Sequence, residues 1–306
     1  MDAKVILITG CSSGIGAAIA ERLTAAGHQV VASARRKHSL STLESAGATA
    51  LELDVTDEKS MTEAVKNVEA RFGRIDVLVN NAGYSQSGAT EEVPLDAVRR
   101  QFETNVFGAL RLTQLVLPGM RARKSGQIVN LSSMGGRLTF PGFGVYHASK
   151  YALEALSDAL RCELRYLGVS VVLIEPGLIK TEFGKAAISS LAGLSGAAGA
   201  GPSESPYAAF NAALAKTTAE GYEKGPLAAL AGTADDVARV VERAISARRP
   251  KARYTVTPSA TLMLGLRRWL SDPLWDAFVG SIVPAPGKIR DTIAKGSLPR
   301  ASPTSE

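Results

Sequence analysis

The chain has 306 residues, enough to bury one sizeable α/β core, and a single domain is the organisation we favour for this length. The net charge of +6 is dispersed, apart from basic residues near 35–37 and 247–253, so the charge pattern does not indicate a nucleic-acid-binding surface. The two cysteines and three histidines form neither a disulfide framework nor the spacing of a metal site, so we expect no metal.

The chain begins with a predicted strand near residues 4–9, where a short apolar run is rich in β-branched residues. Only four residues precede this run, which leaves no room for a signal peptide, so we expect a cytoplasmic protein. A turn with the sequence Gly10-Cys11-Ser12-Ser13-Gly14-Ile15-Gly16 follows. A helix then carries an apolar stripe at Ile15, Ile19 and Leu23, and Gly27 is placed to cap its end.

The glycines of this turn allow a close approach between the backbone and a ligand, and free amides at a helix N-terminus favour a phosphate. The spacing is G-x-x-x-G-x-G rather than the dinucleotide fingerprint G-x-G-x-x-G. On its own, the turn is therefore compatible with a purely structural role. Its position between a strand and a helix makes a nucleotide site the stronger interpretation.

Short apolar runs alternate with segments of helical period along the chain, a pattern typical of a parallel sheet covered on both faces. We predict strands near 4–9, 29–34, 48–54, 77–80, 126–132, 169–175 and 252–257. Three helical stripes are predicted to face the core: Met61, Val65, Val68 and Phe72; Leu95, Val98, Phe102 and Val106; and Leu153, Leu156, Leu160, Leu164 and Leu167.

The end of the second strand bears on the choice of cofactor. A carboxylate at this position accepts hydrogen bonds from the ribose of NAD, whereas a basic residue pairs with the 2′-phosphate of NADP. The chain reads Ala34-Arg35-Arg36-Lys37, with three cations and no carboxylate. Arg35 and Arg36 therefore favour NADP(H) over NAD(H), which stays open, and a solvated basic turn is the alternative.

Tyr146 and Lys150 are four residues apart and therefore lie on one face of a helix. A fixed positive charge beside a tyrosine favours the phenolate and makes it a usable proton acceptor nearer neutral pH. The spacing alone is weak, because such pairs occur on many solvated helices. His147 lies about 100° round the helix from Tyr146, and we interpret it as a packing residue.

Pro176-Gly177 interrupts the chain after the sixth strand and precedes a long segment, 178–232, that we predict to be a helical substrate lid. Its apolar side chains are sufficient to cover a bulky lipophilic ligand: Phe183, Ile188, Leu191, Leu194, Tyr207, Phe210, Leu214 and Tyr222. The alternative is a face that packs against another subunit. Residues 189–206 are dominated by Ser, Gly, Ala and Pro, and we expect this stretch to be mobile.

Residues 258–287 form a predicted amphipathic extension, in which Leu262–Leu270, Trp275 and Phe278 provide the apolar face. Charged residues and Pro273 interrupt every window long enough for a membrane span. We favour closure of the substrate pocket or a dimer contact, and contact with a membrane surface is the alternative. The polar tail, 288–306, is predicted to be disordered.

These motifs resemble the classical short-chain dehydrogenase/reductase family over residues 3–256. The matching positions occur in the order of the family: Thr9-Gly10-x-x-x-Gly14-Ile15-Gly16, Asn80-Asn81-Ala82-Gly83, Asn105, Ser133, Tyr146-x-x-x-Lys150 and Pro176-Gly177. The glycine turn, the long lid and the C-terminal run resemble the branch of 17β-hydroxysteroid and retinol dehydrogenases. The lid and tail contain no histidine to meet the distal oxygen of a steroid, so other lipophilic alcohols and ketones stay open.

The resemblance implies a Rossmann-type doubly wound parallel sheet over residues 1–257 and a catalytic set of Asn105, Ser133, Tyr146 and Lys150. Tyr146 would exchange a proton with the substrate oxygen, Lys150 would lower its pKa and hydrogen-bond the nicotinamide ribose, and Ser133 would stabilise the developing charge. Asn105 would distort its helix and hold a water that links Lys150 to solvent. A turn cap is the alternative role for either Ser132 or Ser133; the spacing of thirteen residues to Tyr146 selects Ser133.

The resemblance also implies which residues contact the cofactor. Asp54 would hold the adenine amino group, the backbone of Asn81, Ala82 and Gly83 would lie against the adenine-side ribose, and Thr181 would meet the nicotinamide carboxamide. The full expected set is Gly10, Ser12, Ser13, Gly14, Ile15, Gly16, Arg35, Arg36, Asp54, Val55, Asn81, Ala82, Gly83, Tyr146, Lys150, Pro176, Gly177, Ile179 and Thr181.

The predicted activity is NADP(H)-dependent interconversion of a lipophilic alcohol and its ketone or aldehyde, in a homodimer or homotetramer. A catalytically silent nucleotide sensor and a membrane-surface scaffold are the alternatives from other classes of protein.

Overall fold

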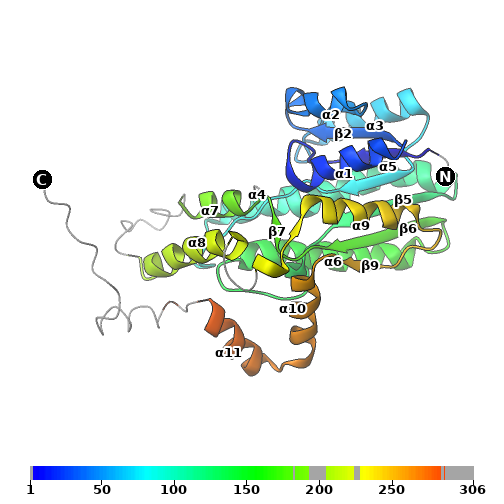
Figure 1. Cartoon of the computed structure of the whole chain (residues 1–306). Helices are drawn as coiled ribbons and strands as arrows, with labels where there is room; N and C mark the ends of the chain where they lie inside the picture. Colours follow the sequence, from blue (N-terminus) through cyan, green and yellow to red (C-terminus); the bar gives the residue numbers. More distant parts are fainter. Residues whose placement is uncertain (1–2, 182, 193–204, 224–227, 284–285, 287–306) are drawn as a thin grey trace, which may run out of the picture.

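The computed structural model describes residues 3–181, 183–192, 205–223, 228–283 and 286, and its centre is a seven-stranded parallel sheet with helices on both faces (Figure 1). The strands lie in the order β3-β2-β1-β4-β5-β6-β9, so the winding direction reverses between β1 and β4. Their bounds are β1 Val5–Ile8, β2 Gln29–Ala34, β3 Thr49–Glu52, β4 Val77–Asn80, β5 Gly126–Leu131, β6 Val169–Glu175 and β9 Arg253–Thr255. The predicted doubly wound sheet is confirmed.

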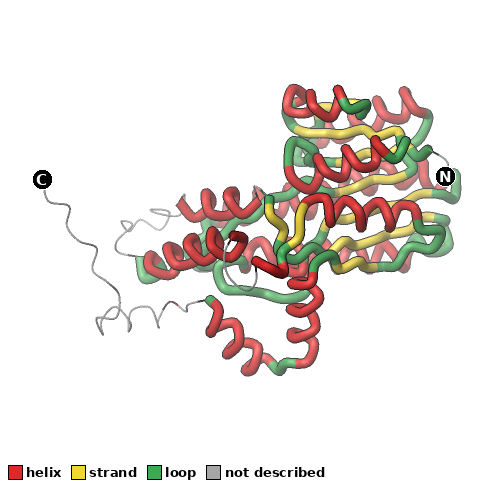
Figure 2. Tube along the Cα trace, viewed as in Figure 1, coloured by secondary structure: helices red, strands yellow, loops and turns green. Residues whose placement is uncertain are grey.

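Helices cover both faces of the sheet, as the tube in Figure 2 shows. They are α1 Gly14–Ala25, α2 Ser41–Ser45, α3 Glu58–Phe72, α4 Leu95–Phe102, α5 Gly108–Ala122, α6 Gly144–Glu163, α7 Phe183–Ala192, α8 Ala208–Glu223, α9 Ala234–Ser246, α10 Pro258–Trp269 and α11 Asp272–Ile282. Local signals set several ends. Asp57 caps α3 by accepting from Ser60 N at 2.7 Å, and Gly27, with φ of +85°, ends α1 as predicted.

Strand side chains alternate between two apolar cores, because successive residues of a strand point to opposite faces. Ile6 and Ile8 face the core formed with α1 and α9, whereas Leu7 faces the core formed with α3 and α5. All three are fully buried. Strand β1 is therefore apolar on both faces, and this is why it is legible in the sequence as a short continuous apolar run.

Two of the residues expected in the core are exposed. Leu95 lies in the first turn of α4 and is 61% exposed, and Leu167 is 43% exposed because α6 ends at Glu163 before reaching it. The stripe on α3 is confirmed for Met61, Val65 and Val68, which are buried. Periodicity identifies the apolar face of a helix but does not show where the helix ends, and both errors fall at a helix end.

The lid segment begins and ends at a small second sheet, in which β7, Ile179–Lys180, pairs in parallel with β8, Gly232–Thr233. Between these strands, α7 and α8 bury Leu191, Phe210 and Leu214 against Val145 of α6. Most of the stretch expected to be mobile, 189–206, and the side chains of Phe183, Leu194 and Tyr222 lie outside the described residues. The predicted disordered tail, 288–306, also lies outside them.

The C-terminal extension forms two helices, α10 and α11, that diverge from the body of the molecule in Figure 1. Met263 and Trp275 pack against Leu138, in the segment that joins β5 to α6. Trp275 is buried and contacts Phe140 at a ring-centroid distance of 6.0 Å, so it is not available to a lipid surface. Within the described part of the chain, no helix has the length and apolar character needed to cross a bilayer.

Candidate functional site

A cavity of 410 Å³ lies where the carboxyl ends of the strands meet the glycine turn. In an open α/β sheet this edge, beside the point where the strand order reverses, is where ligands bind. The lining residues come from the first six strands, the segments that follow them and α6: Gly10, Ser12, Ser13, Gly14, Ile15, Gly16, Ala34, Arg35, Leu53, Asp54, Val55, Thr56, Asn81, Ala82, Gly83, Tyr84, Thr104, Leu131, Ser132, Tyr146, Lys150, Pro176 and Thr181.

The glycine turn is held against the end of β4 by Asn81. Its Nδ2 donates to the carbonyls of Thr9 at 2.8 Å and Gly10 at 3.0 Å. Gly10 has a φ of +74°, and a Cβ on Gly16 would lie 2.3 Å from Gly10 O. Only glycine fits at these two positions, so the backbone and the N-terminus of α1 are exposed to the cavity. Such a cradle of amides suits the diphosphate of a dinucleotide.

Of the two arginines expected to meet a 2′-phosphate, the structure places only Arg35 in the cavity lining. Arg36 follows it in extended backbone, with φ of −125°, and is not part of the lining. Successive side chains of extended backbone point in opposite directions, which explains the separation. Asp54 lines the same cavity, and its Oδ1 accepts from Thr56 N at 2.9 Å.

Helix α6 carries Tyr146 and Lys150 into the cavity wall, and both residues are buried. The Lys150 Nζ lies 5.9 Å from the centroid of the Tyr146 ring and donates to the carbonyl of Leu131 at 2.7 Å. Burial lowers the pKa of the Lys150 ammonium to about 8, and the nearby Glu154 carboxylate opposes this lowering. The Lys150 ammonium therefore lies near the Tyr146 ring in the folded chain.

Ser133 begins the short helical turn after β5, and its Oγ accepts from Gly135 N at 3.1 Å. The turn-capping contact considered for this serine is thus present. Ser133 is not part of the cavity lining, whereas the preceding Ser132 is. Ser133 lies immediately beyond the cavity wall, in the segment that packs against the C-terminal extension.

Asn105 lies behind the cavity wall rather than in it. The helix around it is π-helical over Glu103–Phe107, which agrees with the expected local distortion. Its amide nitrogen donates to Tyr84 O and Ser149 Oγ, both at 3.1 Å, and its oxygen accepts from Tyr84 N at 3.2 Å. Asn105 therefore ties α6 to the segment that follows β4.

Pro176 and Thr181 line the cavity as expected, but Gly177 and Ile179 do not. A Cβ on Gly177 would lie 2.3 Å from Thr257 Oγ1, so this glycine serves the close approach of the segment before α10. Ile179 is buried in the core on the α1 and α9 face of the sheet. Both residues shape the route of the chain toward the lid.

Sequence reasoning missed several residues of the cavity wall: Ala34, Leu53, Thr56, Tyr84, Thr104, Leu131 and Ser132. Most of these residues are next to a motif position in the sequence. That adjacency was the only feature of the sequence that could have predicted them. Thr104 has no such neighbour among the cofactor positions. The π-helical turn brings it to the cavity wall. Among the described residues, no group of His, Cys, Asp or Glu is arranged to hold a metal ion.

His147, between Tyr146 and Lys150 in sequence, is a packing residue. Its ring stacks on Phe143 at a centroid distance of 5.8 Å, and its Nδ1 accepts from Phe140 N at 3.3 Å. A Cβ on Gly135 would lie 2.3 Å from the His147 ring, so Gly135, two residues after Ser133, makes room for this ring. Burial lowers the pKa of His147 to about 4.

Known proteins resemble this chain over most of its length. The family model for short chain dehydrogenases matches residues 4–192. A curated relative, "NADPH-dependent 3-dehydrocapnine reductase" of Ornithobacterium rhinotracheale, is 37% identical over 89% of this chain and 95% of its own length. A "3-ketodihydrosphingosine reductase" of Bacteroides thetaiotaomicron is 40% identical over 60% of this chain and 66% of its own length.

Among solved structures, a short-chain dehydrogenase from Streptomyces avermitilis superposes with a TM-score of 0.73 at 35% identity, covering 97% of this chain and 100% of the other. The sequence motifs, the fold and these matches agree. The chain is an oxidoreductase that belongs to the short-chain dehydrogenase/reductase family.

Proposed function

We propose that this oxidoreductase uses NADP(H) to interconvert a lipophilic alcohol and its ketone or aldehyde, with Tyr146 as the general acid and base. One observation carries the proposal: the Tyr146 phenol and the Lys150 ammonium share a single cavity with the glycine turn and Arg35. A proton-transfer pair and a phosphate-binding backbone in one cavity suit hydride transfer to or from a dinucleotide.

The residues present fit an NADP molecule. The amides of the glycine turn would meet the diphosphate, and Arg35 would pair with the 2′-phosphate, where an NAD-binding chain would carry a carboxylate. Asp54 and the backbone of Asn81–Gly83 would lie along the adenosine half. When bound, NADPH supplies the hydride for reduction and NADP⁺ accepts it in oxidation. NADH remains a weaker second cofactor in this proposal.

In the direction of reduction, Tyr146 donates its phenolic proton to the substrate oxygen as the carbonyl carbon becomes tetrahedral. The Lys150 ammonium would favour the resulting phenolate by its charge, and Ser133, two residues after β5, would hydrogen-bond the same oxygen. Asn105 would contribute indirectly, because its hydrogen bonds hold Tyr84 and Ser149 of α6 in position relative to each other.

A lipophilic substrate is supported by the apolar cluster under the lid, where Leu191, Phe210 and Leu214 meet Val145, one residue before Tyr146. After Ser133, Leu138 and Phe140 form a second apolar cluster that Trp275 covers. The two relatives described above are named as reductases of a 3-dehydro and a 3-keto compound, and both names suit the reducing direction.

The test is consumption of NADPH with a series of ketones and aldehydes of increasing alkyl chain length, including steroids and retinoids. We expect kcat/KM to rise with chain length and NADPH to be used in preference to NADH. Binding of NADPH without turnover of any carbonyl compound would favour the alternative of a nucleotide sensor. A kcat/KM that is higher for small hydrophilic carbonyls than for long-chain ones would refute the lipophilic substrate class. It would leave the proposed reaction and cofactor standing.

We also propose a homo-oligomer. Leu95 on α4 and Phe107, which precedes α5, are large apolar side chains that are 61% and 51% exposed, and a second copy of the chain would cover them. Sedimentation of the wild-type chain at several concentrations tests the proposal, and Phe107→Glu is expected to shift the equilibrium toward monomer. A chain that is monomeric at micromolar concentration would exclude it.

Contact of the extension with a membrane surface remains a separate proposal. Leu262 and Trp269 lie one heptad apart on α10 and are 48% and 83% exposed, and Arg268 lies 5.9 Å over the Trp269 ring. Co-sedimentation with anionic liposomes is the test, with Trp269→Ala as the variant expected to lose binding. If the wild type and Trp269→Ala bind liposomes equally, or if neither binds, the proposed membrane contact through Trp269 is excluded.

A further inference from the structure

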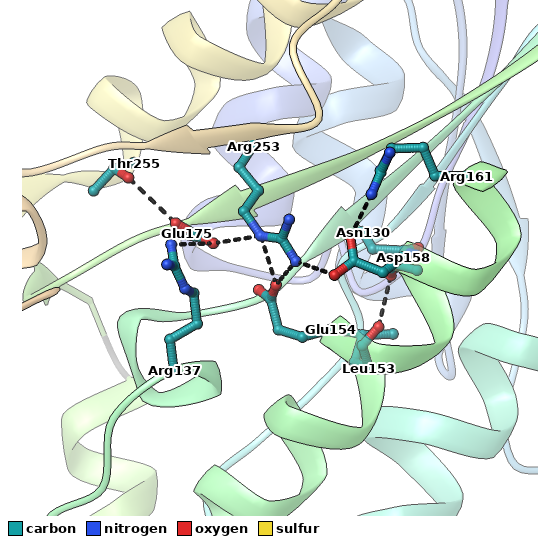
Figure 3. Close-up of polar contacts among 10 residues, drawn as sticks. Asn130, Arg137, Leu153, Glu154, Asp158, Arg161, Glu175, Arg253 and Thr255 are labelled. Atoms are coloured by element: carbon teal, nitrogen blue, oxygen red, sulfur yellow. Dashed lines mark hydrogen bonds and ion pairs between the residues drawn. The ribbon is translucent and has the colours of Figure 1, made fainter. Parts of the chain in front are cut away.

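A group of charged side chains, which we call the Arg253 cluster, lies beside the catalytic helix and outside the cavity. It consists of Glu154, Asp158 and Arg161 on α6, Glu175 on β6, Arg253 on β9, and Arg137 in the segment after Ser133. Figure 3 shows the Arg253 guanidinium between the three carboxylates. Nothing in the proposed reaction uses these residues directly.

Arg253 holds the cluster together. Its Nη2 lies 3.0 Å from Glu154 Oε2 and 2.6 Å from Asp158 Oδ2, and its Nε lies 3.1 Å from Glu175 Oε1. Arg137 reaches the same Glu175 oxygen at 3.5 Å, and Thr255 Oγ1 donates to the other oxygen at 3.2 Å. One guanidinium therefore joins the catalytic helix to the last two strands of the sheet.

Two of the carboxylates are deeply buried: the side chain of Glu175 is fully buried and that of Glu154 is 7% exposed. Burying a charge is costly even when it is paired, and apolar residues of similar size often serve stability equally well. Glu175 is matched by two arginines and Thr255. Glu154 is less well matched, because its Oε1 has no hydrogen-bond partner of ordinary geometry among the described residues.

The position of Glu154 connects it to the proposed proton-transfer pair. It lies four residues after Lys150 on α6, which places both on one face of the helix, one turn apart. Gly136 lets the chain pass close to both: a Cβ there would lie 2.9 Å from Glu154 Cγ and 3.2 Å from Lys150 O. The same added Cβ would lie 2.8 Å from the hydroxyl oxygen of Ser132, a residue of the cavity wall.

We propose that Glu154 is a positioning residue for the reaction proposed above, on which this inference rests: its buried carboxylate keeps the Lys150 ammonium charged beneath Tyr146, and Arg253 holds that carboxylate in place. The carboxylate acts through space along one turn of α6. Arg253 moderates the effect of the Glu154 carboxylate, because its guanidinium contacts that carboxylate and carries the opposite charge.

The charges around Glu154 agree with this role. Burial and the neighbouring Glu175 carboxylate raise the pKa of Glu154, while Arg253 and the nearby Ser132 hydroxyl oppose the rise. No direct hydrogen bond of ordinary geometry joins Ser132 to Glu154. The other titratable groups that face this region are Lys150, Asp158 and Arg161 on α6, Arg137 and Glu175. His147, one turn before Lys150, is neutral at physiological pH because burial lowers its pKa to about 4.

The sign of the effect follows from electrostatics. Removing the negative charge of Glu154 weakens proton binding by Lys150 and Tyr146 together, and removing the positive charge of Arg253 strengthens it. The two groups titrate as a coupled pair, so the direction holds whichever of them loses the proton. A residue that only supported the fold would lower kcat without moving the pH dependence in opposite directions.

The experiment compares the alkaline limb of kcat/KM for ketone reduction in Glu154→Gln, Arg253→Gln and the wild type. We expect the midpoint of this limb to move to lower pH by about 0.5–1 unit in Glu154→Gln and to higher pH in Arg253→Gln. Asp158→Asn is the matched control, because it removes another carboxylate of Arg253 that lies a further turn from Lys150. Arg253→Lys keeps the charge, and both controls should leave the limb within about 0.2 pH unit of the wild type.

A second measurement does not depend on turnover: an NMR pH titration of ¹³C-labelled lysine, with the Lys150 signal assigned by its loss in Lys150→Met. Its midpoint should fall in Glu154→Gln and rise in Arg253→Gln. An unchanged midpoint and limb in both folded variants would overturn the inference, as would a shift of the same sign in both. If one variant does not fold, the sign in the other decides. An inactive wild type would instead refute the proposed function, and the titration would still test the role of Glu154.

Discussion

Lys150 donates a hydrogen bond from its Nζ to the main-chain carbonyl of Leu131 at 2.7 Å, which joins α6 to the end of β5. The two residues that follow Leu131 are Ser132, on the cavity wall, and Ser133, the predicted partner of the substrate oxygen. This hydrogen bond thus fixes the position of the Lys150 ammonium relative to the segment that carries the two serines, and Tyr146 lies on the same helix as Lys150.

Replacing Lys150 with Met should remove turnover without destabilising the protein at pH 7. A pKa lowered from 10.5 to about 8 means that keeping this ammonium charged in the buried site costs roughly 3 kcal/mol. That cost offsets the roughly 1–3 kcal/mol expected from leaving the Leu131 carbonyl without its partner. We expect kcat to fall by at least about 100-fold and the free energy of unfolding, measured with urea, to fall by less than about 1 kcal/mol. A large loss of stability would show that Lys150 is needed mainly for folding.

Arg35→Ser should weaken NADPH binding by about 10- to 100-fold, the range expected for losing a charge-assisted hydrogen bond. NADH binding should change by less than about threefold, because NADH carries no 2′-phosphate. Arg36→Ser is the matched control and should have little effect on either cofactor, since Arg36 is not part of the cavity lining. Titration of cofactor fluorescence measures all four values, and equal losses in the two variants would contradict the assignment to Arg35.

Gly16→Ala should abolish cofactor binding. The added Cβ would lie 2.3 Å from Gly10 O and 2.5 Å from Asn81 Nδ2, so the turn would have to open and lose the hydrogen bonds that hold it to β4. Gly265→Ala is the control, because its Cβ would meet nothing within 4 Å and alanine favours the helix α10. Calorimetric titration with NADPH should show no binding to the first variant and unchanged binding to the second. Tight binding to Gly16→Ala would show that the turn does not contact the cofactor.

His147 should make the fold sensitive to acid. Its pKa is about 4 in the folded chain, against the ordinary histidine value of 6.5 once the chain unfolds, so the unfolded chain binds more protons between these two pH values. The contribution to stability is therefore complete above pH 6.5 and is lost as the pH falls toward 4. Between pH 7 and pH 5 this amounts to about 2 kcal/mol. Between pH 7 and pH 5, the free energy of unfolding in urea should decline less in His147→Gln than in the wild type, by that amount. An identical decline in the two proteins would mean that His147 is not buried in neutral form.

The central strands could be predicted from the sequence because they contain short apolar runs buried on both faces, such as Val5–Ile8. The glycine turn was equally legible, since its function depends on the backbone of consecutive residues. Leu95 and Leu167 were placed in the core wrongly: Leu95 is the first residue of α4 and faces solvent, and Leu167 lies past the end of α6.

What the sequence did not reveal depends on contacts between distant segments. Tyr84 and Thr104 reach the cavity wall because Asn105 ties the segment after β4 to a π-helical turn. Arg36 was paired with Arg35 by proximity in sequence, but extended backbone separates their side chains. Glu154 gave no functional signal at all, because its partner Arg253 is 99 residues away and on another element.

The role of Tyr146 is tested most directly by Tyr146→Phe, with kcat for ketone reduction and the Kd for NADPH measured on the same preparation. The substitution keeps the aromatic ring and removes the proton, so we expect kcat to fall by at least about 100-fold while the Kd changes by less than about threefold. Turnover close to that of the wild type would contradict the assignment of Tyr146 as the general acid and base, and with it the proposed mechanism.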